Sequence, residues 1–263
     1  MKIKIYQIDA FTKNVFGGNP AAVCVLKNWL EEDVMQHIAA ENNLAETAFV
    51  VKNEHTYEIR WFTPTVEVDL CGHATLAAAY VLFQYEGVVG SELLFFSPRS
   101  GNLPVRKEPN GFLTLNFPAD TLRLHKDFEG EISIALSVTP LEIYKGASDF
   151  MVVLATQKEI EEVSPDFAAL SKLKARGVIV TAKGDAVDFV SRFFAPQSGI
   201  DEDPVTGSAH TSLTPYWSKK LNKKKLQAKQ LSKRSGDLTC TFLEDRVEIS
   251  GQAVVYLIGE IEI

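Results

Sequence analysis

Apolar and polar residues alternate with a period of two along much of the chain, which is the pattern of strands with one buried face. Strands are predicted at residues 2–9, 57–62, 93–97, 112–117, 151–155, 178–181, 187–194, 238–242, 247–250 and 253–263. Helical spacing is found in fewer places, at residues 34–39, 72–83, 165–173 and 207–221. Strands and helices do not alternate regularly, so the pattern predicts an α+β fold.

Two motifs half a chain apart resemble each other. Phe-Thr-Pro at 62–64 precedes Cys-Gly-His-Ala at 71–74 and a helical run, and Phe-Ala-Pro at 194–196 precedes Thr-Gly-Ser-Ala at 206–209 and another helical run. The glycines of the two helix starts are 135 residues apart. We therefore predict two related lobes joined near residues 118–130. The first helix is rich in alanine, and we expect strands to pack closely around it.

The composition fits a globular protein with a sizeable core, since 46% of the 263 residues are hydrophobic and 23% are charged. A net charge of −7 argues against a general affinity for nucleic acid or anionic membranes. One basic stretch departs from this mean, because no acid occurs between Asp203 and Asp237. Its cations are Lys219, Lys220, Lys223, Lys224, Lys225, Lys229, Lys233 and Arg234. It could attract an anionic substrate or RNA, but a solvated helix end and loop is the favoured interpretation.

Other sequence features exclude several classes of protein. The apolar run at 74–83 has half of the roughly 20 residues that span a bilayer, and residues 1–9 alternate instead of forming a signal-peptide core, so we expect a cytoplasmic protein. The three cysteines have no C-x-x-C spacing, which favours reduced thiols. No two of the five histidines are spaced as a metal pair, and neither nucleotide-binding glycine motif occurs. We expect no metal site and no cofactor.

The two repeated motifs each place a glycine-containing loop at a helix start. Unpaired backbone N–H groups and the positive end of the helix dipole could hold a carboxylate there or stabilise an enolate. Two ordinary helix caps explain the spacing equally well.

Three side chains near helix ends could carry chemistry. Glu46 stands where a helix stops and an apolar strand begins, and apolar neighbours would raise its pKa toward that of a general base. From the residues alone, a solvent-exposed helix end is favoured over this role. Asp203 precedes Pro204 near the second helix start, where an acid is also an ordinary cap. His73 lies at the first helix start, where the dipole would keep its imidazole neutral, although a lone histidine is more often structural.

Several longer motifs resemble one known family. They are Asp-Ala-Phe at 9–11, Phe-Gly-Gly-Asn-Pro-Ala-Ala-Val at 16–23, Asn-Leu-Ala-Glu-Thr-Ala-Phe at 43–49, Phe-Thr-Pro at 62–64, Leu-Cys-Gly-His-Ala-Thr at 70–75, Arg-Phe-Phe-Ala-Pro at 192–196, Glu-Asp-Pro-Val-Thr-Gly-Ser-Ala-His at 202–210, Gly-Gln-Ala-Val-Val at 251–255 and Gly-Glu-Ile at 259–261. In these motifs the chain resembles the PhzF-like family of phenazine biosynthesis proteins, whose fold is shared with diaminopimelate epimerase.

The resemblance implies a particular architecture. It implies two similar lobes, each a strongly curved, mostly antiparallel sheet wrapped around a central helix, with the active site in the cleft between them. The expected N-terminal lobe comprises residues 1–117 and is joined by the final strand at 256–263. Residues 118–255 form the expected C-terminal lobe.

The resemblance also implies a cofactor-independent isomerase that acts on a small carboxylate-bearing substrate, often as a homodimer. Glu46 would be the acid/base that carries the proton. The residues implied to assist or to bind substrate are His73, Asp203, Asn19, Gly72, Gly207 and Ser208. We expect no nucleic acid or membrane partner.

Two departures from related patterns affect this interpretation. Residues 233–236 read Lys-Arg-Ser-Gly where the family tends to have Arg-Gly-Gly, so the flanking substrate contact of the family is not expected to carry over unchanged. A two-base epimerase has a thiol before the glycine at both helix starts, whereas this chain has Cys71 at the first and Thr206 at the second. A threonine hydroxyl is too weak an acid to serve as that second base.

Three functions therefore stay open at the level of sequence. The leading hypothesis is an isomerase in which Glu46 moves a proton between two carbons. The alternatives are a racemase or epimerase that uses Cys71 as one base, and a small-molecule-binding protein without catalysis.

Overall fold

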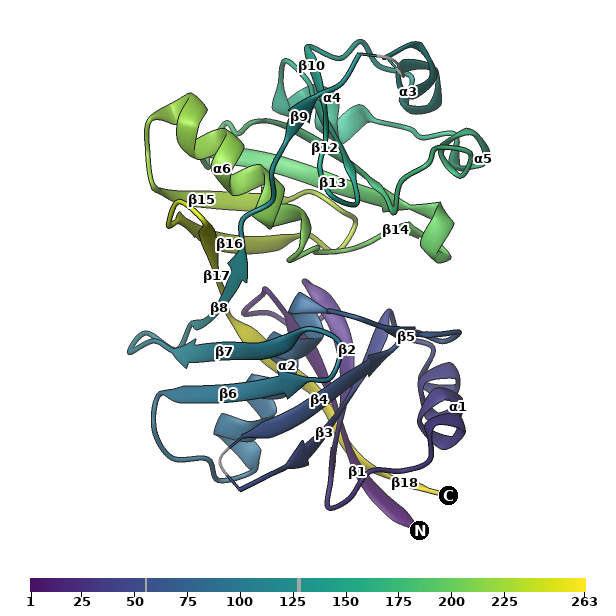
Figure 1. The fold of residues 1–263 in the computed structure, drawn as a ribbon, viewed down its shortest axis with the longest axis vertical. Helices are drawn as coiled ribbons and strands as arrows, with labels where there is room; N and C mark the ends of the chain where they lie inside the picture. Colours follow the sequence, from purple (N-terminus) through teal and green to yellow (C-terminus); the bar gives the residue numbers. More distant parts are fainter. Residues whose placement is uncertain (55, 127–128) are drawn as a thin grey trace. The chain divides into compact units, whose positions relative to one another are not determined.

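The computed structural model describes residues 1–54, 56–126 and 129–263, and the chain divides into two compact units (Figure 1). The first unit comprises Met1–Asn116 together with Ser250–Ile263, and the second comprises Phe117–Ile249. Each unit consists of a curved sheet and a few helices, which confirms the α+β fold predicted from the sequence.

The first unit contains a mostly antiparallel sheet. Its strands are β1 (Lys2–Ala10), β2 (Asn19–Leu26), β3 (Glu46–Lys52), β4 (Tyr57–Phe62), β5 (Glu67–Val68), β6 (Glu92–Ser97), β7 (Gly101–Lys107), β8 (Leu113–Pro118), which runs into the second unit, and β18 (Ala253–Glu262). They pair in the order β18-β1-β2-β3-β4-β6-β7-β8, and β5 pairs with β4. The parallel pairs are β2–β3, connected through α1 (Glu32–Asn42), and β4–β6, connected through α2 (Gly72–Tyr85).

The second unit is built in the same way. Its strands are β9 (Arg123–Leu124), β10 (Glu142–Lys145), β11 (Phe150–Val153), β12 (Val178–Lys183), β13 (Phe189–Ala195), β14 (Ile200–Glu202), β15 (Lys225–Gln230), β16 (Gly236–Phe242) and β17 (Arg246–Gly251). Its helices are α3 (Glu129–Leu136), α4 (Gln157–Glu162), α5 (Phe167–Leu170) and α6 (Ala209–Leu221), with a 3₁₀ turn at Pro196–Ser198. The strands pair in the order β9-β10-β11-β12-β13-β15-β16, with β14 on β13.

The two pairing orders correspond strand by strand. Parallel pairs β11–β12 and β13–β15 of the second unit match β2–β3 and β4–β6 of the first, and α6 takes the place of α2. The edge strands also match, since β9 pairs with β10 as β18 pairs with β1. The internal repeat seen in the sequence is therefore a repeat of topology.

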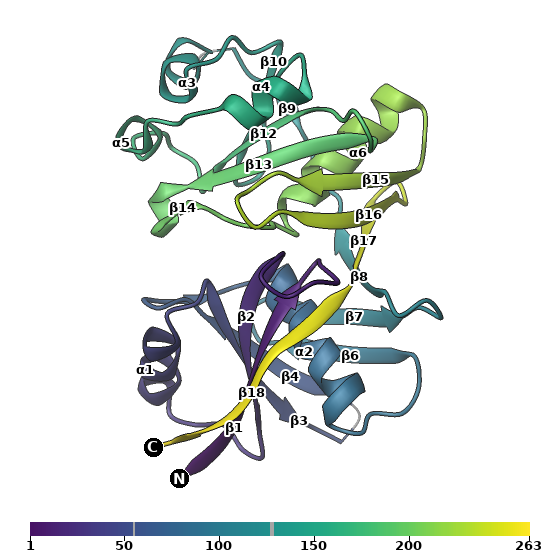
Figure 2. The same ribbon diagram turned by 180° about the vertical axis from the view of Figure 1, so that it is seen from behind.

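Helices pack against both faces of the sheet of the first unit. Helix α2 lies behind β4, β6 and β7 in Figure 1 and beside β18 in the reverse view of Figure 2, and every residue from Gly72 to Ala79 is buried. The small alanine side chains let the strands approach the helix closely. On the other face, Cys24 and Phe49 pack against Met35 and Ile38 of α1. Helix α2 is the buried centre that its alanine content predicted.

Several elements differ from the sequence predictions. No strand was predicted at β2, because Ala21–Cys24 is buried on both faces and its sequence is continuously apolar instead of alternating. Helix α5 occupies only four residues of the predicted helix at 165–173, and α4 before it was not predicted.

Part of the basic stretch forms a strand, so its interpretation as a helix end and loop was wrong for β15. Leu226, Ala228 and Gln230 are buried, while Lys225 and Gln227 are exposed, which is the alternation of a half-buried strand. Acids from elsewhere in the second unit neutralise several of its cations: Lys220 pairs with Glu142 at 2.6 Å and Lys223 with Asp188 at 2.7 Å.

No helix in the described parts of the chain combines the length and apolar character needed to cross a membrane.

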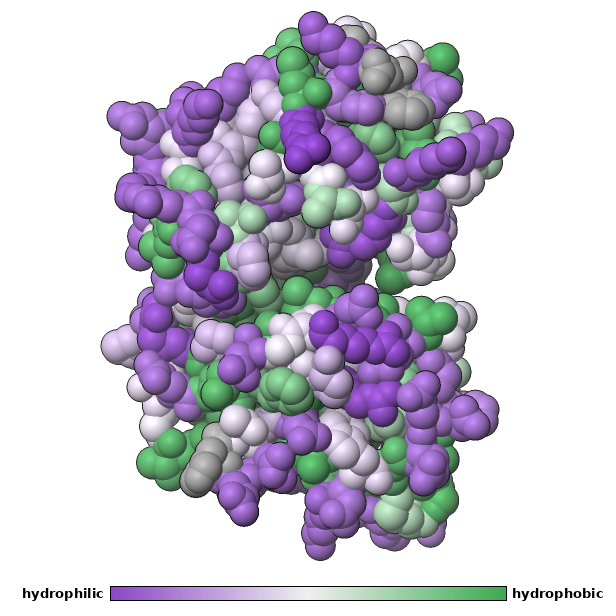
Figure 3. Space-filling model, in the orientation of Figure 1, coloured by the Kyte–Doolittle hydropathy of each residue, from purple (hydrophilic) through white to green (hydrophobic). Residues whose placement is uncertain are grey.

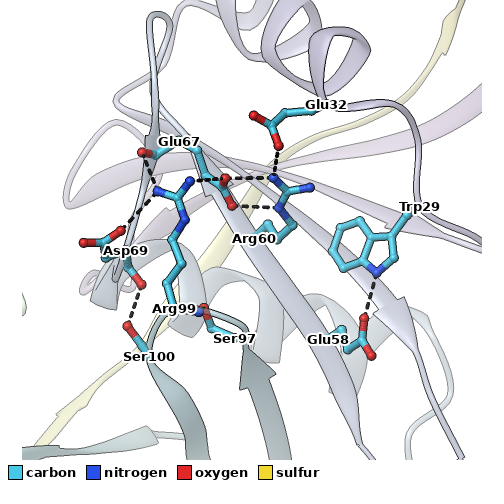
Figure 4. A network of polar contacts seen from close by, with 9 residues as sticks. All are labelled: Trp29, Glu32, Glu58, Arg60, Glu67, Asp69, Ser97, Arg99 and Ser100. Carbon is cyan, nitrogen blue, oxygen red and sulfur yellow. Dashed lines mark hydrogen bonds and ion pairs between the residues drawn. The ribbon is translucent and has the colours of Figure 1, made fainter.

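An arginine and carboxylate network joins β4, β5, α1 and the β6–β7 turn (Figure 4). Glu67 accepts hydrogen bonds at 2.7 Å from Arg60 and from Arg99, and Arg60 also pairs with Glu32 at 2.7 Å. Figure 3 shows strongly hydrophilic side chains gathered over β5. These groups and Trp29 line a cavity of about 270 Å³. Both guanidinium groups already bind carboxylates, so we assign the network a structural role in holding these elements together.

Replacing Glu67 with alanine is expected to lower the free energy of unfolding by about 1.5–3 kcal/mol, because Arg60 would lose its buried charged acceptor. The Glu67 side chain is only 8% exposed. The matched control is Glu260→Ala, whose carboxylate is 54% exposed and pairs with Lys2, and whose effect should stay within about 0.5 kcal/mol. Urea denaturation of both variants measures the difference, and equal losses would contradict the structural role of Glu67.

Candidate functional site

Glu46, Cys71 and His73 come together in the first unit. The imidazole Nε2 of His73 lies 3.1 Å from Oε2 of Glu46, and the sulfur of Cys71 lies 3.5 Å from Nδ1 and 4.0 Å from Nε2 of the same ring. Cys71 and His73 are buried, and the Glu46 side chain is 14% exposed. The cluster therefore combines a carboxylate, an imidazole and a thiol in a largely buried position.

The register of the sheet puts Glu46 in this position. In the parallel pair β2–β3, Glu46 lies opposite Ala21 and Ala48 lies opposite Val23. Because side chains alternate along a strand, Glu46 shares its face with Ala48, whereas Phe49 belongs to the opposite face, which packs on α1. Glu46 thus starts a strand on the face away from α1, where it meets the start of α2. The exposed helix end favoured from the residues alone is wrong.

The neighbouring groups set the protonation of His73. Burial alone would lower the pKa of His73, but the Cys71 sulfur and the Glu46 carboxylate raise it, and the result lies well above the ordinary value. The sequence-based expectation that the helix dipole keeps this imidazole neutral is therefore wrong, because the neighbouring Cys71 sulfur and Glu46 carboxylate raise the pKa of His73. Burial, followed by the nearby Glu46 charge, raises the pKa of the Cys71 thiol.

Asn19 contacts the second ring nitrogen of His73, Nδ1. Its amide nitrogen lies 3.1 Å from Nδ1 of His73, and the Asn19 residue is fully buried at the start of β2. An amide can donate to a neutral ring through its nitrogen or, after a flip, accept from a protonated ring through its oxygen. The residue proposed from the sequence as a substrate contact is here a partner of His73.

The second unit has its own cluster around the start of α6. The hydroxyl of Thr206 donates to Oδ2 of Asp203 at 2.5 Å. The buried side chain of Gln230 holds both residues: its Nε2 donates to the Asp203 carbonyl oxygen at 2.8 Å, and its Oε1 accepts from the Thr206 backbone N–H at 2.8 Å. Gln230 therefore fixes the loop that presents Asp203.

At both helix starts, a side chain contacts the backbone carbonyl oxygen four residues earlier. The Thr75 hydroxyl donates to the Cys71 carbonyl oxygen at 2.6 Å, and Nδ1 of His210 lies 2.8 Å from the Thr206 carbonyl oxygen at the corresponding position. Burial lowers the pKa of His210 to about 4, so its ring is neutral and Nδ1–H donates to that carbonyl. Gly72 is the first residue of α2.

The structure thus places the candidates from the sequence in two groups. Glu46, His73 and Asn19 meet in the first unit, together with Cys71. Asp203, Gly207 and the N-cap residue Ser208 lie along one short loop of the second unit. The sequence reasoning missed Gln230 and His210. The signal for Gln230 was a polar residue in the buried phase of an alternating strand, hidden in the basic stretch.

Comparison with known proteins gives one consistent result. The sequence model described as "Phenazine biosynthesis-like protein" matches residues 8–259. An uncharacterized isomerase of Pseudomonas aeruginosa is 49% identical, with 100% of each chain covered. The crystal structure of a PhzF family protein from Enterococcus faecalis superposes with a TM-score of 0.96 at 49% identity, again over 100% of each chain.

A more distant structure shares the fold alone. It is a hydroxyproline epimerase from Agrobacterium vitis, with a TM-score of 0.61 at 8% identity, 99% of this chain and 92% of that chain being covered.

The chain forms two curved sheets, and each is wrapped around a central helix whose start carries a Gly-containing motif. This architecture places the protein among the epimerase-fold proteins. Within that class, the match over nearly the whole chain narrows the assignment. The chain belongs to the phenazine biosynthesis-like (PhzF) family.

Proposed function

We propose that this protein is an isomerase that moves a proton within a small carboxylate-bearing substrate, with Glu46 as the acid/base. The observation that supports the proposal most directly is the pair of Glu46 and buried His73, 3.1 Å apart at the start of a buried helix. The relatives named as isomerases support the general class.

In the proposed reaction Glu46 takes a proton from one carbon and returns it to another. The raised pKa of His73 favours an imidazolium 3.1 Å from the Glu46 carboxylate, which is the group that accepts the proton in this proposal. Backbone N–H groups at the start of α2 would stabilise the enolate that forms meanwhile. Proton transfer of this kind needs no cofactor, and none is part of the proposal.

For the second unit, the proposal keeps the roles implied by the family resemblance. Asp203 assists the proton transfer, and Gly207 and Ser208 bind substrate. Gln230 would act through Asp203, because it holds the backbone on both sides of the Asp203–Thr206 loop.

The proposal is tested by solvent deuterium exchange on candidate carboxylates. The expected result is deuterium at a carbon that carried no exchangeable proton in the starting compound, with the double bond displaced in the product. Exchange at a single stereocentre would instead indicate racemisation, and ligand binding without exchange would indicate a non-catalytic protein.

Racemisation is the second candidate, because the Cys71 sulfur lies in the same cluster as Glu46. Two observations weigh against a two-thiol mechanism. Thr206 occupies the position that corresponds to Cys71, and its hydroxyl donates to Asp203 and so is engaged. Burial also raises the pKa of Cys71, which disfavours the thiolate.

Cys71→Ala is expected to keep most of its kcat and to lose at most about 1–2 kcal/mol of stability through the missing sulfur. The reason is that the proposed proton carrier is Glu46, and alanine fits a small buried site. Turnover of a confirmed substrate and a thermal melt measure both quantities. A well-folded but inactive Cys71→Ala protein would transfer the catalytic role to the thiol.

A further inference from the structure

Asn19 is the polar side chain of the Glu46–His73 cluster to which the proposed function gives no role. Its amide nitrogen lies 3.1 Å from Nδ1 of His73, while Oε2 of Glu46 lies 3.1 Å from Nε2 of the same ring. Asn19 is fully buried, and His73 is only 4% exposed. The ring is therefore held between an amide and a carboxylate, with one of them at each nitrogen.

The amide determines which ring nitrogen faces Glu46. An imidazole can turn over about its last side-chain bond, because that torsion is broad and roughly two-fold. The Cys71 sulfur lies 3.5 Å from Nδ1 and 4.0 Å from Nε2, so it distinguishes the two nitrogens poorly. Asn19 lies at Nδ1, and the hydrogen bond of one ring nitrogen sets the state of the other. The amide thus keeps Nε2 directed at the carboxylate.

An amide also suits a ring that changes its charge. A neutral imidazole with its hydrogen on Nε2 accepts at Nδ1, where the Asn19 nitrogen can donate, whereas an imidazolium donates from both nitrogens and needs an acceptor there. The Asn19 oxygen is that acceptor once the amide has turned over. Among the described residues, the titratable groups at the ring are Glu46 from β3 and Cys71, which precedes α2. Burial lowers the pKa of His73, but these two groups raise it well above its ordinary value, so the acceptor is needed.

The connection between β1 and β2 is built to hold Asn19 in place. Phe11, Phe16 and Gly18 have positive φ angles of 61°, 71° and 60°. Residues other than glycine adopt this conformation at a cost, which persists only where the surrounding structure over-determines it. Here the backbone N–H of Phe16 donates to Oδ2 of the buried Asp9 at 2.8 Å. Asn19 directly follows this loop, so the loop fixes the position from which the amide acts.

We propose that Asn19 is a positioning residue of the proton transfer: its amide holds His73 by Nδ1 so that Nε2 faces Glu46, and it turns between donor and acceptor when His73 changes its charge. The part in proton transfer rests on the proposed function, whereas the control of the ring does not. This role differs from the substrate contact that the family resemblance implied, because positioning acts on the chemical step and a substrate contact acts on affinity.

NMR of the imidazole nitrogens in the full-length protein tests the control of the ring without a substrate, with the signal of His73 assigned by its loss in His73→Gln. Asn19→Leu removes both donor and acceptor and should lower the pKa of His73 by about one to two pH units, since a hydrogen bond to a charged group is lost. Asn19→Asp keeps an acceptor at Nδ1 and should not lower it. The matched control is Asn42→Leu, which removes an amide that donates to Thr47 and should leave His73 unchanged. A thermal melt checks folding, and Asn19→Ala is the second variant where leucine is not accommodated.

With a confirmed substrate, kinetics separate positioning from binding. Asn19→Leu should lower kcat by about 10–100-fold with little change in KM, since a misplacement of about 1 Å can cost about 100-fold. The alkaline limb of its pH–kcat profile should move to lower pH, because the imidazolium is lost at lower pH. Asn19→Asp should recover most of the lost kcat.

Three results would overturn the positioning role. They are an unchanged pKa of His73 in folded Asn19→Leu and Asn19→Ala proteins, an equal decrease in Asn42→Leu, and a raised KM with unchanged kcat in Asn19→Leu, which would assign Asn19 to substrate binding. The expected NMR result without any proton-transfer activity would refute the proposed function and leave the control of the His73 ring by Asn19 standing.

Discussion

Replacing Glu46 with glutamine is expected to lower kcat by about 10²–10⁴-fold, the typical contribution of a positioned acid/base. The amide preserves the size of the side chain and can still contact His73, but it cannot accept a proton from carbon. Substrate affinity and folding should therefore change little. The measurement is steady-state turnover and solvent deuterium exchange of a confirmed substrate, with folding followed by a thermal melt.

The matched control is Glu41→Gln, which neutralises an exposed carboxylate near the end of α1 and should leave kcat unchanged. His73→Ala and Asp203→Ala should be less severe than Glu46→Gln, because they tune or orient the reacting groups. A Glu46→Gln protein with activity within about threefold of the wild type would exclude Glu46 as the base.

Replacing Gly18 with alanine is expected to cost roughly 3 kcal/mol or more of stability. Gly18 has a φ of +60°, and a Cβ there would lie 2.0 Å from the backbone oxygen of Ala10. Backbone atoms cannot rotate away as a side chain can, so the loop before β2 must shift. That loop leads directly into Asn19, so the contact between Asn19 and His73 should weaken as well.

Gly101→Ala is the control for this prediction, because Gly101 has a similar φ of +70° but nothing within 4 Å of the added Cβ. It should cost only the conformational penalty of about 1–2 kcal/mol. The difference between the two variants in urea denaturation isolates the steric clash. If both lose the same amount, the loop relaxes and the close approach at Gly18 has no energetic importance.

Sequence reasoning was most effective where a pattern is local. The alternation in β4 predicted a strand, and the alanine-rich face of α2 predicted a buried helix. In both cases the side chains of the element itself indicate which of its faces is buried. It failed for β2, since a strand covered on both faces has no alternation. It also failed for β15, where the number of lysines concealed an alternating pattern.

The candidate site shows the same division between local and long-range information. Glu46 and His73 were each found from their position at the end of an element. Their distance of 3.1 Å depends on the register of β2 with β3 and on the path of the chain into α2, neither of which is encoded in a short window. For that reason the charge state of His73 was wrongly predicted: the dipole is local, but Glu46, one of the two groups that raise the pKa of His73, is 27 residues away in the sequence.

The last strand has a consequence for how the protein emerges from the ribosome. β18 pairs with β1 from Lys2–Glu262 to Ala10–Ala253, so the sheet of the first unit lacks this edge until residues 253–262 have been translated. The second unit, by contrast, is continuous from Phe117 to Ile249 and can be complete earlier. Synthesis normally favours folding from the N-terminus onward. Here the later half of the chain can reach its native state first, while β1 waits with an unpaired edge that is open to incorrect pairing.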